Sequence, residues 1–459
     1  MAKRKRRARS VSSASRRAAA PSPPPVSRLT LGEAVAVAAL IVVLAGTALA
    51  VDPGAQASFD APKRLVTVSG VVLAAIGAFG LGRRSRRFRE VWHAVPFAVR
   101  LALGAAAAAL LWSVISAVLS PRRAASLDSL RALLLYSTLI PLGASRAAAR
   151  GKTPLVAAFL AATAANAVIS LLQSRGVQPF RLETFGTRNE TGALAGNVGY
   201  LTLAVALAAV LSLGLVLTTR GRPRTFALAG LVLFVAALLV NRNRTALLSL
   251  GAGGVALVVA LFGRRSLAPI AGVAAVLVAA VIFVGPLRDR AGETFADVRA
   301  GDWDRLTTYR AGAWAAAIEM ARERPLAGWG PGTYAAEFVP HRLRAEIRAR
   351  RRFVNPLVTS SYSEAHCDYL QAFAETGVPG GVTALVAAGA LLTAIGGKAR
   401  APRASRPEAA ILLGILVAGA VAALTWFPLQ RPISAAPLLL AAGRSWRLAA
   451  GWGEEATSP

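Results

Sequence analysis

Residues 193–217, with the sequence ALAGNVGYLTLAVALAAVLSLGLVL, decide the fold class because they contain no charged side chain. A helix of about 20 such residues crosses the hydrocarbon core of a bilayer. Similar apolar runs occupy residues 31–51, 65–81, 95–119, 127–144, 154–172, 226–240, 246–262, 267–284, 378–395, 409–427 and 433–450. The sequence therefore predicts an all-α polytopic membrane protein with about twelve transmembrane helices.

The composition supports this fold class and excludes others. Hydrophobic residues make up 55% of the 459 residues and charged residues only 16%, unlike an ordinary soluble domain. The net charge is +31, which on a soluble chain would indicate nucleic acid binding. Here the basic residues gather at the ends of the apolar runs, so no basic face remains for nucleic acid. Cys367 is the single cysteine, so no intrachain disulfide forms.

The distribution of Lys and Arg predicts the orientation, because basic residues in short loops stay on the cytoplasmic side. With the N-terminal tail inside, twenty-eight Lys and Arg fall on the inner side and eleven in the short outer loops. We therefore expect both termini in the cytoplasm. The expected segments are a disordered basic tail (1–30), nine helices (31–284), a large outer loop (285–377), three helices (378–450) and a cytoplasmic tail (451–459).

The outer loop differs from the rest of the chain in charge and in patterning. It holds thirteen Arg and twelve acidic residues, so it is nearly neutral. Apolar residues recur at helical spacing over 311–320, and Gly328, Gly330 and Gly332 provide turn chemistry. A loop of this length in a compact protein is more often functional than not. We expect the loop to be partly helical and to carry the chemistry.

His366 is the candidate base. It lies in the sequence Ser363-Glu-Ala-His-Cys-Asp-Tyr-Leu-Gln371, just before the tenth expected span, among carboxyl and phenol groups. An imidazole in this setting accepts a proton from a hydroxyl near neutral pH. The alternative is a helix-capping or surface histidine. His93 and His341 are expected to be structural or solvated, and no pair of histidines has the spacing of zinc ligands.

Arginines at the outer ends of the helices are candidates for binding an anion. Arg242 and Arg244 precede the eighth span, and Asn243 or Thr245 is expected to cap that helix. Guanidinium groups beside a helix N-terminus suit a phosphate. Arg188 with Asn189 precedes the sixth span, and Arg310 lies in the outer loop. The alternative is that these arginines only reach toward lipid headgroups.

Four stretches of the chain together resemble the O-antigen ligase and O-antigen polymerase superfamily of bacterial membrane glycosyltransferases. They are Phe185-Gly-Thr-Arg-Asn-Glu-Thr-Gly192, Asn241-Arg-Asn-Arg-Thr-Ala-Leu-Leu248, Arg310-Ala-Gly-Ala-Trp314 running into Arg324-Pro-Leu-Ala-Gly-Trp-Gly-Pro-Gly-Thr-Tyr334, and His366-Cys-Asp-Tyr-Leu-Gln-Ala-Phe-Ala-Glu-Thr-Gly-Val-Pro-Gly380. The resemblance extends from the fifth expected span to the tenth. It implies a GT-C-like fold with a large periplasmic loop.

The resemblance also implies roles for individual residues. His366 matches the essential loop histidine of the family, Arg244 the arginine at the start of a helix, and Arg310 the loop arginine. Arg188 and Arg242 match less closely as donor-binding residues. Supporting roles fall to Asn189, Asp368, Tyr369 and Glu375. The chain departs from the family at Cys367, where an Asn is frequent.

The implied activity is transfer of a glycan from undecaprenyl diphosphate to an acceptor hydroxyl at the periplasmic face of the bacterial inner membrane. The implied reaction needs neither a metal nor another cofactor. The partners would be the lipid-linked glycan donor, membrane lipids and a lipid A-core or glycan acceptor. A ligase, a repeat-unit polymerase and a protein O-oligosaccharyltransferase all fit the motifs. A lipid or solute transporter would require ionisable residues at mid-membrane depth and an inverted repeat, and the sequence contains neither.

Overall fold

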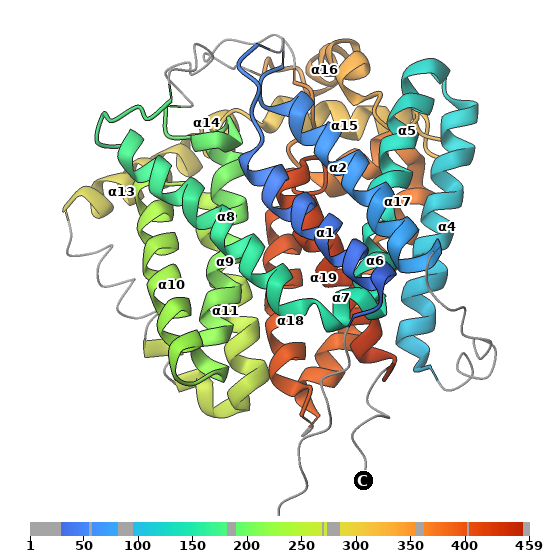
Figure 1. Ribbon diagram of the computed structural model, residues 1–459. Coiled ribbons are helices and arrows are strands. Elements are labelled where there is room, and N and C mark those ends of the chain that lie inside the picture. Colours follow the sequence, from blue (N-terminus) through green and yellow to red (C-terminus); the bar gives the residue numbers. More distant parts are fainter. Residues whose placement is uncertain are drawn as a thin grey trace, which may run out of the picture.

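The described part of the chain is built entirely from helices, as the apolar runs predicted. The computed structural model describes residues 29–54, 57–80, 95–180, 190–268, 270–272, 285–353, 362–401 and 404–452. Long helices run side by side between the two ends of a bundle, and shorter helices lie across one end (Figure 1). The all-α fold class is therefore confirmed.

Eight helices of the described residues are long and apolar enough to cross a membrane, and each coincides with an expected span. They are α1 (Leu31–Leu49), α2 (Asp60–Ala75) continued by η1 (Ile76–Gly80), α4 (Phe97–Leu119), α8 (Lys152–Gln173), α9 (Val198–Thr218), α10 (Arg222–Asn241), α11 (Arg244–Phe262) continued by η3 (Gly263–Ser266), and α17 (Asp368–Arg400). Helix α9 follows the short η2 (Ala193–Ala195) and is the most buried of the eight.

The remaining four expected spans differ from a simple crossing helix. The run at 127–144 is divided into α5 (Arg123–Ser137) and α6 (Leu139–Ala144), because Pro141 has no N–H to bond the carbonyl of Ser137. Helices α18 (Arg406–Ala422) and α19 (Pro432–Ala449) run between the two ends of the bundle but do not meet the length and hydropathy of the other eight. Most of the run at 267–284 lies outside the described residues.

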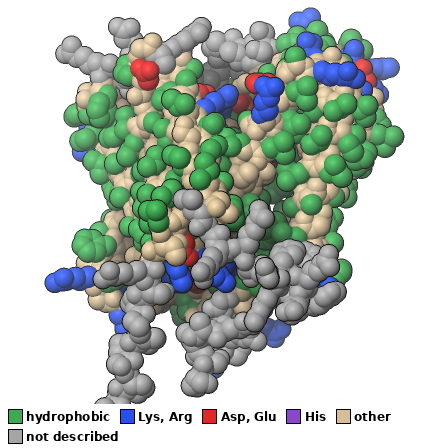
Figure 2. All heavy atoms as spheres, turned by 45° about the vertical axis from the view of Figure 1, so that its right-hand side comes forward, with side chains coloured by type: hydrophobic (Ala, Val, Ile, Leu, Met, Phe, Trp, Pro, Cys, Tyr) green, Lys and Arg blue, Asp and Glu red, His purple; other side chains and the backbone are tan. Residues whose placement is uncertain are grey.

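The two ends of the bundle differ in the residues that they gather. One end, called here the Glu408 end, joins the start of α1 to α7 (Arg146–Arg150) through the Arg150–Glu33 ion pair of 2.7 Å. Glu408 accepts from Lys152 at 3.1 Å and from Arg444 at 2.6 Å at the same end. The loop that contains His366 lies at the other end, called here the His366 end. A broad hydrophobic band separates the charged side chains of the two ends (Figure 2).

The segment after α11 forms a helical layer over the His366 end (Figure 1). It consists of α13 (Gly285–Ala300), α14 (Trp303–Leu306), α15 (Ala311–Glu323) and α16 (Tyr334–Ala349). The expected helix over 311–320 and the turn at Gly328, Gly330 and Gly332, which all have positive φ, are both present. Helices α15 and α16 share a core that includes Met320, Tyr334 and Phe338.

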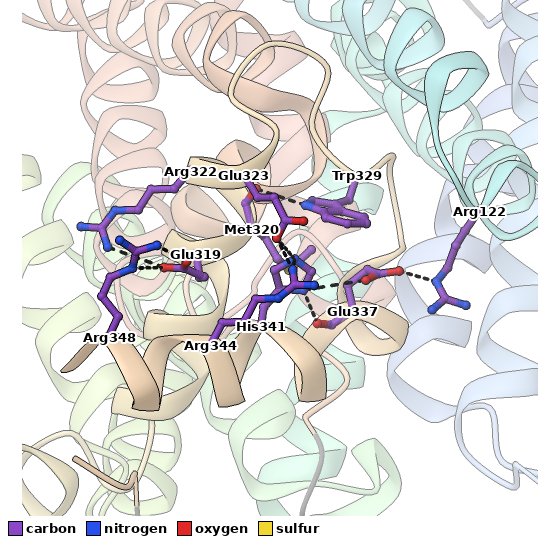
Figure 3. Close-up of polar contacts among 10 residues, drawn as sticks. All are labelled: Arg122, Glu319, Met320, Arg322, Glu323, Trp329, Glu337, His341, Arg344 and Arg348. Atoms are coloured by element: carbon purple, nitrogen blue, oxygen red, sulfur yellow. Dashed lines mark hydrogen bonds and ion pairs between the residues drawn. The ribbon is translucent and has the colours of Figure 1, made fainter. Parts of the chain in front are cut away.

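A buried histidine of α16 links α16 to the end of α15, as Figure 3 shows. His341 is fully buried, and its Nδ1 lies 2.6 Å from the carbonyl oxygen of Glu337 while its Nε2 lies 3.1 Å from Glu323. The Glu337 carboxylate also pairs with Arg122, which immediately precedes α5. Of the two roles expected for His341, structural or solvated, the structure shows the structural one, and His93 lies outside the described residues.

Helix α17 begins ten residues before the expected span and changes direction at Gly377, where φ is +68°. A Cβ at this position would lie 2.2 Å from the carbonyl oxygen of Leu326. The short stretch of α17 before Gly377 therefore packs against the turn after α15, and Val378 donates to the carbonyl of Pro325 at 2.7 Å. This contact anchors the outer layer on a membrane-spanning helix.

Replacing Gly443 by Ala should destabilise the bundle, because α19 crosses α6 backbone to backbone at this residue. A Cβ on Gly443 would meet the carbonyl oxygen of Ile140 at 1.8 Å, so the two helices would have to separate. We expect a loss of about 1–3 kcal/mol, seen as a lower temperature of unfolding in detergent. Gly389→Ala is the control, because nothing lies within 4 Å of the added methyl group. Equal unfolding temperatures for the two variants would contradict the close crossing.

Candidate functional site

His366 is held in a left-handed backbone conformation at the end of the outer layer, with φ of +54°. Its main-chain carbonyl accepts from Trp314 Nε1 at 3.3 Å, which ties it to α15. The preceding N–H, of Ala365, donates to Gln371 at 3.0 Å, which ties the loop to α17. The main chain at His366 is thus held by both α15 and α17.

The protonation state of His366 follows from its contacts. Nδ1 lies 3.1 Å from the carbonyl oxygen of Glu364, which can only accept, so Nδ1 carries the hydrogen and Nε2 keeps its lone pair. Burial lowers the pKa of His366 to about 4, and the positive charge of Arg310 adds to this effect. At neutral pH the imidazole is neutral, and Nε2 is a base.

Three aromatic rings surround the imidazole. Two of them, Trp426 and Phe427, belong to the segment that joins α18 to α19. The centroids of the Tyr362, Trp426 and Phe427 rings lie 5.1, 5.2 and 4.9 Å from that of His366, and each ring is nearly perpendicular to it. Such edge-to-face contacts restrict the orientation of the imidazole. None of these three aromatic residues was singled out from the sequence.

Arg310 shares Trp426 with His366. Its guanidinium carbon lies 4.9 Å from the Trp426 ring centroid, and Nη1 donates to the carbonyl of Thr425 at 2.9 Å. Burial lowers its pKa to about 10, so the group stays charged at neutral pH. The structure therefore brings the predicted base and the predicted loop arginine to one place.

The turn between α10 and α11 reaches the same place. Arg242 ends α10 with φ of +51°, and Asn243 caps α11 by accepting from Ala246 N at 3.2 Å. Arg244 is the first residue of α11, and both arginines are exposed. The hydroxyl of Thr245 lies 2.8 Å from that of Thr425, the residue whose carbonyl holds Arg310.

The stretch around Arg188 is described only from Glu190 onward, so the predictions for Arg188 and Asn189 lie outside the described residues. Thr191, which follows them, donates to Asn241 Oδ1 at 2.7 Å, and Asn241 donates to Ser170 at 2.9 Å. The end of the stretch therefore lies against the last residue of α10.

The three described supporting residues bind neighbouring backbone. Asp368 accepts from Leu429 N at 3.0 Å, and its own N–H donates to the carbonyl of Ala423 at 3.0 Å. Tyr369 donates to the carbonyl of Ala420 at 2.8 Å. Glu375 accepts from Tyr334 N at 3.3 Å and thereby holds the start of α16. Each of them holds the backbone of another element against α17, and none of these contacts involves the imidazole itself.

Arg431 is the charged residue at this site that was missed from the sequence, because it was counted only as a basic residue of an outer loop. Its side chain is only 11% exposed, and it pairs with Asp60 at 2.8 Å and with Glu364. The guanidinium carbon lies 4.6 Å from the Tyr200 ring centroid and 5.5 Å from that of Phe427. The signal in the sequence was the run Trp426-Phe-Pro-Leu-Gln-Arg431, which combines two aromatic residues with a charge between two apolar runs.

Residues 229–385 match the O-antigen ligase family. The match confirms the resemblance to the O-antigen ligase and polymerase superfamily and supports a membrane enzyme of the glycosyltransferase type. Arg242, Arg244, Arg310 and His366 all fall within the matched residues, whereas Arg431 does not. Curated protein sequences give no match.

The departure from the O-antigen ligase pattern at Cys367 changes the start of α17. Cys367 occupies the cap position, is buried, and makes no side-chain hydrogen bond as a cap. Burial raises the pKa of its thiol, so the thiol stays neutral. An Asn would accept a backbone N–H here. In this chain the start of α17 is held instead by the bonds that Asp368 makes to Ala423 and Leu429.

The low pKa of His366 predicts a specific dependence of stability on pH. Between pH 6.5 and about 4 the unfolded chain binds a proton at this residue that the folded chain does not bind. The wild type should therefore lose stability relative to His366→Gln as pH falls through this range, and the difference should be constant above pH 6.5. Unfolding temperatures of both proteins at pH 7.5, 6 and 5 test this. Parallel curves over the whole range would show that the imidazole is not buried.

Replacing Arg431 by Met should destabilise the His366 end, because the Glu364 carboxylate would lose its partner. The two side chains are only 11% and 14% exposed, so the loss should approach the roughly 3–5 kcal/mol of a fully buried pair, seen as a lower unfolding temperature. Adding Glu364→Gln in the same chain should restore part of the loss, because no unpaired carboxylate then remains at residue 364. Arg131→Met, which removes an exposed pair with Asp128, is the control and should change little. A loss no greater than that of the control would count against the role of Arg431.

Proposed function

We propose that this protein transfers a glycan from undecaprenyl diphosphate to an acceptor hydroxyl at the periplasmic face of the bacterial inner membrane. The observation that carries the proposal is the neutral His366 imidazole beside charged Arg310, with Trp426 in contact with both. The match to the O-antigen ligase family supports a ligase or polymerase type of activity. Of the two, we propose the ligase reaction with lipid A-core as the acceptor.

In the proposed reaction, the acceptor oxygen forms a bond to the anomeric carbon while the bond from that carbon to the diphosphate oxygen breaks. The hydroxyl proton goes to Nε2 of His366, and the diphosphate leaves as an anion. Arg310, Arg244, Arg242 and Arg188 would stabilise the negative charge on the leaving group, without a metal or a nucleotide. Asn189 would add hydrogen-bond donors, and Asp368, Tyr369 and Glu375 would hold the surrounding backbone in place.

The proposed orientation places the His366 end in the periplasm and both termini in the cytoplasm. The excess of Lys and Arg on the expected inner side supports it. Arg150, Lys152 and Arg444 lie together at the Glu408 end, opposite His366. In this orientation residues 285–377 form the periplasmic loop, 31–284 and 378–450 the membrane part, and 1–30 and 451–459 the cytoplasmic tails.

An assay with purified protein, a glycan on undecaprenyl diphosphate and lipid A-core tests the assigned roles. His366→Ala should lower the rate about 10²–10⁴-fold, because the hydroxyl loses its base. Arg310→Ala should lower it about 10²–10³-fold, because the leaving group loses a charge partner. Arg222→Ala, at the exposed first residue of α10, is the control and should retain the wild-type rate. Undiminished transfer by His366→Ala would remove the imidazole from the mechanism.

Deletion of the gene in the source organism, followed by gel analysis of surface glycans, distinguishes the acceptor. The ligase proposal expects loss of all long chains from lipid A-core. Single-repeat caps on lipid A-core would instead identify a polymerase. Unchanged surface glycans together with altered solute uptake would contradict both activities and favour a transporter.

A further inference from the structure

A basic hollow lies at the Glu408 end, far from the proposed reaction site. It has a volume of about 500 Å³ and is lined by Leu261, Phe262, Arg264, Arg265 and Arg406. Its residues come from the end of α11, from η3 and from the first residue of α18. The lining thus combines three guanidinium groups with two apolar side chains.

One of the three guanidinium groups is already fixed. Arg406 Nη2 donates to the carbonyl of Ala260 at 3.0 Å and to that of Leu261 at 2.6 Å, which are among the last carbonyls of α11. A side chain held in this way loses little rotamer freedom when it contacts a ligand. Arg264 and Arg265 are exposed at the rim and are free to close on an anion.

Among the described residues that line the hollow there is no carboxylate, in contrast to other basic sites at the same end. Arg150 has Glu33, and both Lys152 and Arg444 have Glu408. Among the described residues, the charges of Arg264, Arg265 and Arg406 are not balanced by an acidic partner. Three like charges around one hollow repel each other, and an anion between them relieves that repulsion.

An apolar stripe on α11 leads away from the hollow. Leu248, Val255 and Phe262 are 63%, 43% and 50% exposed, and their spacing of seven residues places them on one face of the helix. Leu267, which follows η3, is 53% exposed beside the same arginines. The stripe lies on a candidate membrane span, so it faces hydrocarbon rather than water.

We propose that this hollow binds the phosphate headgroup of an anionic membrane phospholipid, with an acyl chain along Leu248, Val255 and Phe262. Basic pockets between membrane helices bind lipid headgroups of this kind. A free phosphate would satisfy the arginines but would leave the apolar stripe unused. The site is separate from the proposed glycan transfer and does not depend on it.

Native mass spectrometry of the full chain in detergent tests the proposal with phosphatidylglycerol, phosphatidylcholine of the same acyl chains, and inorganic phosphate. Arg264→Gln with Arg265→Gln should weaken binding of phosphatidylglycerol about tenfold or more. The control, Arg222→Gln with Arg224→Gln, removes the same charge from the exposed first turn of α10 at the same end. It should leave binding of phosphatidylglycerol unchanged. All four side chains are exposed, so the unfolding temperature without lipid should stay at the wild-type value.

Val255→Ser distinguishes a lipid from an ion, because it changes the stripe and leaves the arginines in place. Weaker retention of phosphatidylglycerol in this variant supports the lipid site. Equal binding of phosphatidylcholine, or an equal loss in the Arg222 and Arg224 control, would overturn the proposal. Displacement of the lipid by an excess of inorganic phosphate would also overturn it, in favour of a simple ion site.

Discussion

The rest of the site depends on the bonds that Asp368 makes to the connection between α18 and α19. Its N–H donates to the carbonyls of Ala423 and Trp426, at 3.0 and 3.3 Å, and its carboxylate accepts from Leu429 N. These bonds hold Thr425, Trp426 and Phe427 against the start of α17, one residue beyond Cys367. They thereby position the Trp426 and Phe427 rings beside His366, and the Thr425 carbonyl that accepts from Arg310.

The hydrophobic pattern was sufficient to predict the helices that cross the bundle, because apolar side chains and charged ends are sorted by the bilayer itself. It did not predict where the run at 127–144 breaks, since a single Pro141 within an apolar run changes hydropathy very little. The early start of α17 was also missed. Residues 368–377 belong to a helix that packs on the turn after α15, and that contact joins segments far apart in the sequence.

Within the candidate site, His366 and Arg310 were predicted because each stands in a motif that the sequence displays locally. Arg431 and Trp426 were missed because their importance arises only when the α18–α19 connection folds against α15 and α17. In the sequence, Arg431 resembles any arginine at the end of a membrane helix. In the structure it is one of the most enclosed charges at the His366 end, paired with two carboxylates and stacked on two rings.

Arg310 and Arg431 are consequently suited to different tasks. Arg431 has its charge balanced by Asp60 and Glu364, so it presents little net field to a ligand and serves to hold the Glu364 loop. The contacts of Arg310 among the described residues are a carbonyl and an aromatic ring, which orient the guanidinium without neutralising it. A diphosphate near His366 would therefore be attracted by Arg310 rather than by Arg431. An acidic partner for Arg310 would weaken the attraction between its guanidinium and the leaving group. It would also raise the pKa of His366, and the imidazole must be neutral to accept a proton.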